Sequence, residues 1–205
     1  RLPELIRAFR QRAPEVELTL VESTTLDQIS ALKEGRIDIG FGRIRFEDPA
    51  IKRTVLQNER LAVALPRGHV LARQDIPLTL QQVADEPQIL YPRAPRPSYA
   101  DQVISLFRDY GLEPTIAHEA RELQIAIGLV AAEEGLAIIP ESISRSRSHD
   151  VVYRDLVEPA TSPIIMSHRI NDNSYELGLM SEVIATEYER WGYPVPKALV
   201  KEDLA

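Results

Sequence analysis

Three segments of the sequence combine hydroxyl side chains or charges with predicted helix starts, a combination that can bind carboxylates. Ser23-Thr24-Thr25 follows a predicted strand and begins a predicted helix. Pro97-Ser98-Tyr99 begins a second helix, where Asp101 completes a capping-box pattern, and Arg121-Glu122 begins a third. The first backbone N–H groups of a helix have no intrahelical acceptor, so they attract anions. Two such groups of donors could hold an acid with a carboxylate at each end, although ordinary helix capping would leave the same pattern.

Arg43 is the cation best placed to join such a site. It follows Gly42 at the end of a predicted strand, and arginine pairs with carboxylates through two parallel hydrogen bonds. A solvated arginine, or one paired with Glu22, is the alternative. Tyr99 could line a ligand with its ring or pack in the core, and Glu122 could be a charge that only favours its helix N-terminus.

Motifs for catalysis, cofactors and metals are missing from the sequence. Gly40-Phe41-Gly42 is only a fragment of a dinucleotide fingerprint, because Arg45 stands where the third glycine belongs. Neither a phosphate-binding lysine loop nor a nucleophile elbow occurs. Four scattered histidines have no metal-ligand spacing: His69, His118, His149 and His168. We therefore expect no catalytic residue, no metal and no cofactor.

Composition narrows the class of protein further. The 205 residues include 24 basic and 31 acidic side chains, a net charge of −7, and 44% are hydrophobic. Such a chain is globular, large enough for one large domain or two small ones, and a poor match for nucleic acid phosphates. No apolar run approaches the roughly 20 residues of a membrane span, and the absence of cysteine excludes disulfides. Arg1 lies inside a helical pattern, so we expect this chain to be a piece of a longer protein.

Strands and helices alternate along the chain and must position these residues. Apolar spacing predicts a first helix that starts at Leu2 and ends before Pro14, and further helices over 25–34, 98–110, 121–134 and 174–191. It predicts strands over 16–20, 37–41, 51–56, 61–65, 88–91, 115–119, 136–139, 151–156 and 164–168. Thr25 with Gln28 reads as a capping box, and Gly35, Gly111 and Gly135 stand where left-handed helix ends favour glycine. The polar residues 194–205 are expected to form a loosely held tail.

This alternation predicts an α/β fold of mostly parallel sheets covered by helices. Chain breaks near residues 65 and 162 indicate two lobes, one made of residues 1–64 and 163–205 and the other of residues 65–162. The second lobe is thus inserted into the first. A cleft between two α/β lobes is a common place for a small ligand.

Two motifs resemble a known family. Residues 32–41 (LKEGRIDIGF) resemble a signature of the effector-binding domain of LysR-type transcriptional regulators, and residues 128–132 followed by 135–140 resemble its second hallmark. The resemblance extends over residues 1–193. Within the family, five segments are similar to regulators of catechol and benzoate degradation that respond to cis,cis-muconate: residues 40–43, 48–51, 91–99, 111–114 and 121–124. Chlorocatechol regulators are more distant.

The resemblance implies a periplasmic-binding-protein-like fold of type II, with two Rossmann-like lobes and the effector in the cleft between them. Thr25 would then bind an effector carboxylate, and Arg43 would line the same pocket. The remaining positions carried over are an opposing wall of Pro97, Ser98 and Tyr99, a border of Glu122 and Leu123, and Ile164 near the crossover. Muconate is a flat diacid with an apolar middle, which suits donors at two ends.

The family also implies a cytoplasmic, non-enzymatic activator of aromatic catabolism that assembles as a homo-oligomer, a dimer or tetramer. It implies that DNA is bound only through a winged helix-turn-helix which, with a leading strand, precedes this sequence. No membrane partner is expected. Gln57 aligns with an arginine of a second site in benzoate-sensing relatives, and a neutral amide argues against that site here. A periplasmic solute-binding protein, or an enzyme such as a dehydratase acting on a small carboxylic acid, is the alternative on the same fold.

Overall fold

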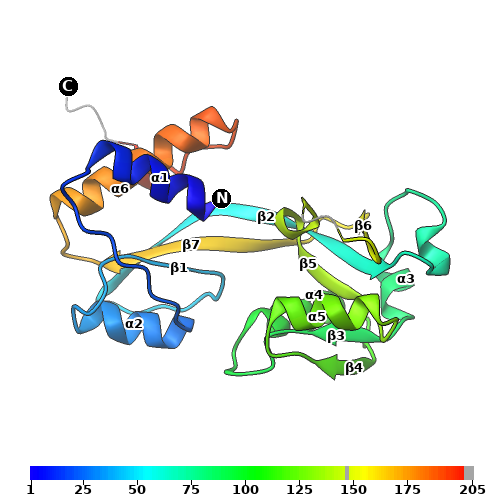
Figure 1. The fold of residues 1–205 in the computed structure, drawn as a ribbon. Helices are drawn as coiled ribbons and strands as arrows, with labels where there is room; N and C mark the ends of the chain where they lie inside the picture. Colours follow the sequence, from blue (N-terminus) through cyan, green and yellow to red (C-terminus); the bar gives the residue numbers. More distant parts are fainter. Residues whose placement is uncertain (146–147, 201–205) are drawn as a thin grey trace. The chain divides into compact units, whose positions relative to one another are not determined.

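A computed structural model describes residues 1–145 and 148–200 of the chain. They form two compact units, one made of residues 1–57 and 163–200 and the other of residues 58–145 and 148–162. Figure 1 shows the elements of each unit. The first division therefore falls after residue 57, where we expected it after residue 64. The division falls earlier because a single strand, Ile51–Pro66, leads the chain from the first unit into the second, and the break that we used as a boundary, Pro66, only ends this strand.

The first unit packs helices over three strands. Its helices are α1 (Leu2–Arg12), α2 (Thr25–Lys33), α6 (Tyr175–Arg190) and the 3-10 turn η3 (Lys197–Leu199), and its strands are β1 (Gly40–Gly42) and parts of β2 (Ile51–Pro66) and β7 (Thr161–Arg169). Helices α1 and α6 lie side by side (Figure 1). Their apolar faces bury Phe9, Val183 and Ile184 with Met166 of β7. Leu199 joins this core, so the expectation of a loose tail is wrong for that residue, while residues 201–205 lie outside the described part.

The second unit has the α/β arrangement that sequence alternation predicts. Its elements are η1 (Val70–Ala72), α3 (Leu80–Ala84), β3 (Gln88–Leu90), α4 (Tyr99–Asp109), β4 (Ile116–Glu119), α5 (Leu123–Ala131), β5 (Ala137–Pro140), η2 (Glu141–Arg145) and β6 (Val151–Asp155). Strands β3 and β4 are parallel, and Gln88 also bridges Leu136 in parallel. Helices α4 and α5 follow the carboxyl ends of β3 and β4, the usual ligand end of a parallel α/β layer.

The larger sheet has the strand order β1-β7-β2-β5, with β6 also paired to β2. Its β1–β7, β2–β5 and β2–β6 ladders are antiparallel, for example Gly40 opposite Ser167 and Ala62 opposite Ile139. The prediction of mostly parallel sheets is wrong here. The two strands predicted over 51–56 and 61–65 are the single 16-residue strand β2, because the polar residues 57–60 stay extended.

Several local predictions also need correction. Residues 16–20 do not form a strand. Val16 and Leu18 pack on the core, but no strand among residues 1–145 and 148–200 pairs with them, and Leu20 is 62% exposed. Residues 37–39 likewise lie outside β1. Helix α5 is shorter than predicted, and Glu133, at φ 64°, takes the left-handed conformation expected of Gly135.

Other end signals are confirmed. Gly35 and Gly111 have φ values of 73° and 69°, and the Ser98–Asp101 capping box begins α4. Gly135 has a different role, because a Cβ there would lie 2.6 Å from the carbonyl oxygen of Pro87. Helix α3, with its Thr79–Gln82 capping box, was not predicted.

Candidate functional site

The start of α2 holds the first group of candidate donors. Thr24, and not Thr25 as the capping-box pattern suggested, is the N-cap: its hydroxyl accepts from the Asp27 backbone N–H at 3.2 Å and donates to the Asp27 carboxylate at 2.8 Å. Thr25 is therefore the first helical residue. Its half-buried hydroxyl makes no hydrogen bond to any other residue that the structure describes. A hydroxyl and first-turn N–H groups together suit an anion.

Two glycines of β1 bring α2 close to that strand. A Cβ on Gly42 would lie 3.3 Å from the Thr25 hydroxyl oxygen, and a Cβ on Gly40 would lie 2.6 Å from the Gln28 side-chain oxygen. The Gln28 amide also donates to the Phe41 carbonyl at 2.9 Å. The sequence Gly40-Phe41-Gly42 is thus a helix-packing motif. It places the residue that follows, Arg43, on the segment beside Thr25, and Arg43 is half-buried.

The backbone after Arg43 is held by another arginine. Arg53 of β2 donates to the carbonyls of Ile44 at 2.6 Å and Phe46 at 3.0 Å, and its Nε donates to the Ser167 hydroxyl at 2.9 Å. Burial, with a smaller contribution from the charge of Arg45, lowers the pKa of Arg53 from its ordinary value. An arginine stays charged after such a shift, so Arg53 keeps strong donors for these carbonyls.

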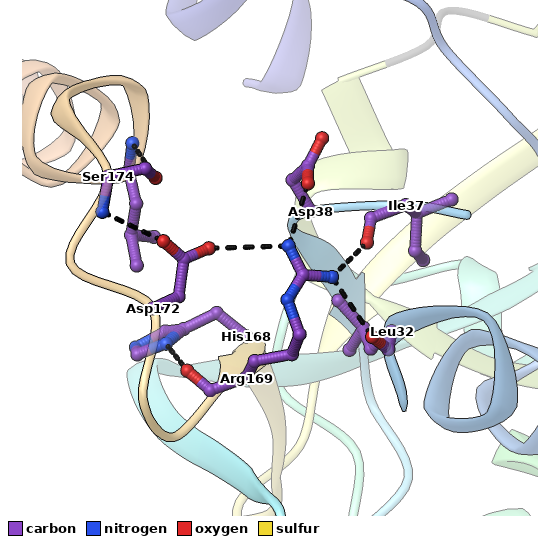
Figure 2. Close-up of polar contacts among 8 residues, drawn as sticks. Leu32, Ile37, Asp38, His168, Arg169, Asp172 and Ser174 are labelled. Carbon is purple, nitrogen blue, oxygen red and sulfur yellow. Dashed lines mark hydrogen bonds and ion pairs between the residues drawn. The ribbon is translucent and has the colours of Figure 1, made fainter. Parts of the chain in front are cut away.

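A third arginine fixes the segment before β1 (Figure 2). Arg169, at the end of β7, donates to the carbonyls of Leu32 at 2.9 Å and Ile37 at 2.7 Å. It also pairs with Asp38 at 2.7 Å and with Asp172 at 3.4 Å. The side chain therefore ties the end of α2 and the start of α6 to the approach of β1.

Asp172 is an ionised member of this cluster. Burial alone would raise its pKa, but hydrogen bonds from Ser174 and the charges of Arg169 and His168 outweigh that effect and lower the pKa below its ordinary value. Its carboxylate accepts from the Ser174 backbone N–H at 2.8 Å, while the Ser174 hydroxyl caps α6 (Figure 2).

In the second unit, Ser98 begins α4 with its hydroxyl fully engaged. The hydroxyl donates to the Pro92 carbonyl at 3.0 Å and accepts from the Ala100 N–H at 3.2 Å. Asp101 accepts from the Ser98 N–H at 2.7 Å and pairs with Arg96, also at 2.7 Å. Ser98 is 5% exposed, so it can serve a ligand only by holding the first N–H groups of α4 in place.

Tyr99 is a packed residue with little surface left for a ligand. It is 7% exposed, its hydroxyl donates to the Ile138 carbonyl at 3.0 Å, and its ring lies 5.2 Å from that of Tyr91. Pro97, by contrast, is exposed. The packing alternative considered for Tyr99 is therefore present, and any ligand role rests on the aromatic surface of Tyr91 and Tyr99.

The remaining predicted residues fall in two places. Glu122 is the exposed N-cap residue of α5 without a side-chain capping bond, and Leu123 begins that helix half-buried. The Arg93 N–H donates to the Ala120 carbonyl at 2.8 Å, which links the segment before α4 to the segment before α5. Ile164, on β7, packs against the core of the first unit.

The histidines have local partners. His69 accepts from the Leu71 N–H and lies 3.2 Å from Glu86, and His118 lies 2.8 Å from Glu134. Within residues 1–145 and 148–200, no group of three or more His, Cys, Asp or Glu side chains could hold a metal ion. Over the same ranges, every helix is too short or too polar to cross a membrane.

Residues 1–176 match the family model described as the LysR substrate binding domain. The chain belongs to this family. This LysR substrate-binding domain is 51% identical over 174 residues to the HTH-type transcriptional regulator CatR of Pseudomonas putida, and 47% identical over 188 residues to the probable cat1 operon transcriptional activator of Acinetobacter lwoffii. The alignments cover 84% and 91% of the domain but only 59% and 62% of those regulators, so the domain spans about three fifths of their length.

The domain is also similar to a solved structure of the same family, the BenM effector binding domain with its effector benzoate. The TM-score is 0.93 at 40% identity, over 98% of this chain and 91% of that chain. The expected periplasmic-binding-protein-like α/β fold is therefore confirmed, as is membership in the family that includes regulators of catechol and benzoate degradation.

Sequence reasoning missed the residues that hold the candidate donors in place. Arg53 and Arg169 belong to no recognisable sequence motif. Each lies on or at the end of a predicted strand, however, where a long cationic side chain can reach the carbonyls of neighbouring segments. Gln28 was interpreted as part of a cap and instead bridges α2 to β1. Thr24 was recognised as a candidate, but not as the cap.

Proposed function

We propose that this domain binds the effector of a transcriptional activator of catechol or benzoate degradation, and that the effector is cis,cis-muconate. Thr25 and Arg43 of the first unit would contact one carboxylate. Pro97, Ser98 and Tyr99 of the second unit would contact the other, bordered by Glu122 and Leu123, with Ile164 as an apolar neighbour. No catalytic step is required, and the similar proteins are transcriptional regulators.

The observation that carries this proposal is that Thr24 and Thr25 have different roles at the start of α2. Thr24 satisfies the cap of α2, while the Thr25 hydroxyl, beside Gly42, is not used by any described residue. A half-buried hydroxyl that the fold does not use is a reasonable donor for a ligand carboxylate. The half-buried Arg43 supplies a charge of the right sign on the adjoining segment.

The chemistry of the second unit favours the same class of ligand. The Ser98 and Tyr99 hydroxyls are committed to the carbonyls of Pro92 and Ile138, so donors for a carboxylate would come from the backbone at the start of α4. The Tyr91 and Tyr99 rings, which pack 5.2 Å apart, would border the conjugated carbon chain of such a ligand. A flat diacid uses both kinds of surface.

The whole regulator would act through population shift. Effector binding would favour one arrangement of the protein over another, and the difference in affinity would be transmitted to a helix-turn-helix domain elsewhere in the protein. We propose that this regulator acts in the cytoplasm, because its DNA-binding domain must reach a promoter, and that it assembles as a homo-oligomer, a dimer or tetramer. Gln57, half-buried on β2, would leave the protein without a second benzoate site.

Calorimetric titration of cis,cis-muconate into the wild type and Thr25→Val tests the proposal. Loss of a hydrogen bond to a charged group costs about 1.5–3 kcal/mol, or roughly a 10- to 100-fold loss of affinity. Thr19→Val is the matched control, because Thr19 is exposed on the preceding segment, and its affinity should stay at the wild-type value. Equal affinity of Thr25→Val and wild type would remove Thr25 from the site.

A further inference from the structure

Strand β1 is too short to fix by itself the residue that follows it. It has three residues, and its one ladder joins it to β7, where Gly42 lies opposite Ile165. Past Gly42 the segment 43–50 has no regular secondary structure. The path of the backbone that follows Arg43 is therefore set by contacts outside the ladder.

Arg53 provides those contacts from two strands away. In the sheet order β1-β7-β2, strand β7 separates Arg53 from the β1 segment, so its side chain must cross β7. It does so over Ser167, which is 2% exposed and accepts a hydrogen bond from Arg53 Nε. Beyond Ser167 the guanidinium reaches the carbonyls of Ile44 and Phe46. These lie one and three residues after Arg43.

We propose that Arg53 is a positioning residue for effector binding, which holds the backbone after β1 so that Arg43 is presented to the effector carboxylate. This inference rests on the proposed contact of Arg43 with the effector. Arg53 itself would not touch the effector, because two of its three nitrogens are committed to Ser167, Ile44 and Phe46. Preorganising a charged group lowers the entropy lost when the ligand binds.

The environment of Arg53 is unfavourable for a cation, which argues that the charged side chain serves a purpose there. Its partial burial is unfavourable for a cation, as the lowered pKa indicates, and Arg45 adds a like charge nearby. A neutral or smaller residue would avoid both costs but could not donate to three oxygens at once. The bond to the Phe46 carbonyl is exposed to solvent, so water can replace it when Arg53 is removed. Stability should therefore suffer less than positioning.

A double-mutant cycle tests the inference: cis,cis-muconate is titrated into the wild type, Arg43→Met, Arg53→Gln and the double variant. If Arg53 acts through Arg43, Arg53→Gln should weaken binding about 5- to 10-fold in the wild-type background and less than about 2-fold in the Arg43→Met background. Arg60→Gln, an exposed residue on the same strand, removes the same charge and should have no effect. Equal losses in both backgrounds, or no loss in the wild type, would overturn the inference.

The two proposals fail in different ways. Wild-type affinity of Arg43→Met would overturn the role of Arg43 and the positioning by Arg53 together, whereas additive losses would overturn only the positioning. A second measurement needs no effector. The Arg43 Nε–H resonance, assigned by its loss in Arg43→Met, should be shifted or broadened in Arg53→Gln and unchanged in Arg60→Gln. An unchanged resonance in Arg53→Gln would contradict the inference, while a restored resonance in Arg53→Lys would support it.

Discussion

Arg169→Met should destabilise the first unit more strongly than the substitution of a partly exposed side chain usually does. The Arg169 side chain is 29% exposed and donates hydrogen bonds to the Leu32 carbonyl at 2.9 Å and the Ile37 carbonyl at 2.7 Å. The substitution leaves both carbonyls without this donor. A half-buried carbonyl left without a partner costs about 1–3 kcal/mol. The pair with Asp38, whose side chain is 80% exposed, adds at most about 1 kcal/mol. We expect a loss of about 3 kcal/mol in the free energy of unfolding.

Urea unfolding followed by tryptophan fluorescence can measure this loss of stability in the first unit alone. The chain has one tryptophan, Trp191, which packs against the core of the first unit. Arg36→Met is the matched control. Arg36 pairs with Glu34, and because the two side chains are 60% and 58% exposed, the change in the free energy of unfolding should be below about 0.5 kcal/mol. A loss for Arg169→Met no larger than that of Arg36→Met would refute the structural role drawn in Figure 2.

The same structure gives expected outcomes for four further variants. Gly135→Ala would place a Cβ 2.6 Å from the Pro87 carbonyl oxygen and should lower the free energy of unfolding by about 2–3 kcal/mol. Gly128→Ala, whose Cβ meets nothing within 4 Å, should raise the free energy of unfolding by about 0.5–1 kcal/mol. Urea unfolding followed by circular dichroism measures both changes. The pKa of Asp172 is lowered on folding, so its stabilising contribution is present above its ordinary value of about 3.9 and is lost as pH falls through the folded pKa. Asp172→Asn should therefore flatten the acid limb of stability against pH, and an unchanged limb would count against the shift. Gln57→Arg should create measurable benzoate binding by calorimetry, and no gain would argue against a latent second site.

The fold could be predicted from the sequence wherever local signals act alone. Helix ends at Gly35 and Gly111, and the Ser98–Asp101 cap, depend on a few neighbouring residues and were predicted correctly. The signature motifs predicted the family, and the alternation of the second unit predicted its parallel strands.

Non-local features could not be predicted in this way. The continuity of β2 depends on strands that come much later in the sequence, namely β5, β6 and β7. The segment 16–20 has the alternation of a strand, but no strand in the described part of the chain pairs with it. Arg53 and Arg169 act on carbonyls that carry no sequence signal, because every residue has one. The candidate donors were thus predictable by type, whereas the side chains that position them were visible only in the structure.

Calorimetric titration of the wild-type chain with cis,cis-muconate and with its trans,trans isomer tests the central proposal most directly. The isomers carry the same charges and atoms but space their carboxylates differently, so a site with donors for both ends must distinguish them. We expect saturable binding of one cis,cis-muconate per chain and at least about 10-fold weaker binding of the trans,trans isomer, which corresponds to 1.4 kcal/mol. Absence of cis,cis-muconate binding by the folded protein, or equal affinity for the two isomers, would contradict the assignment of muconate as the effector.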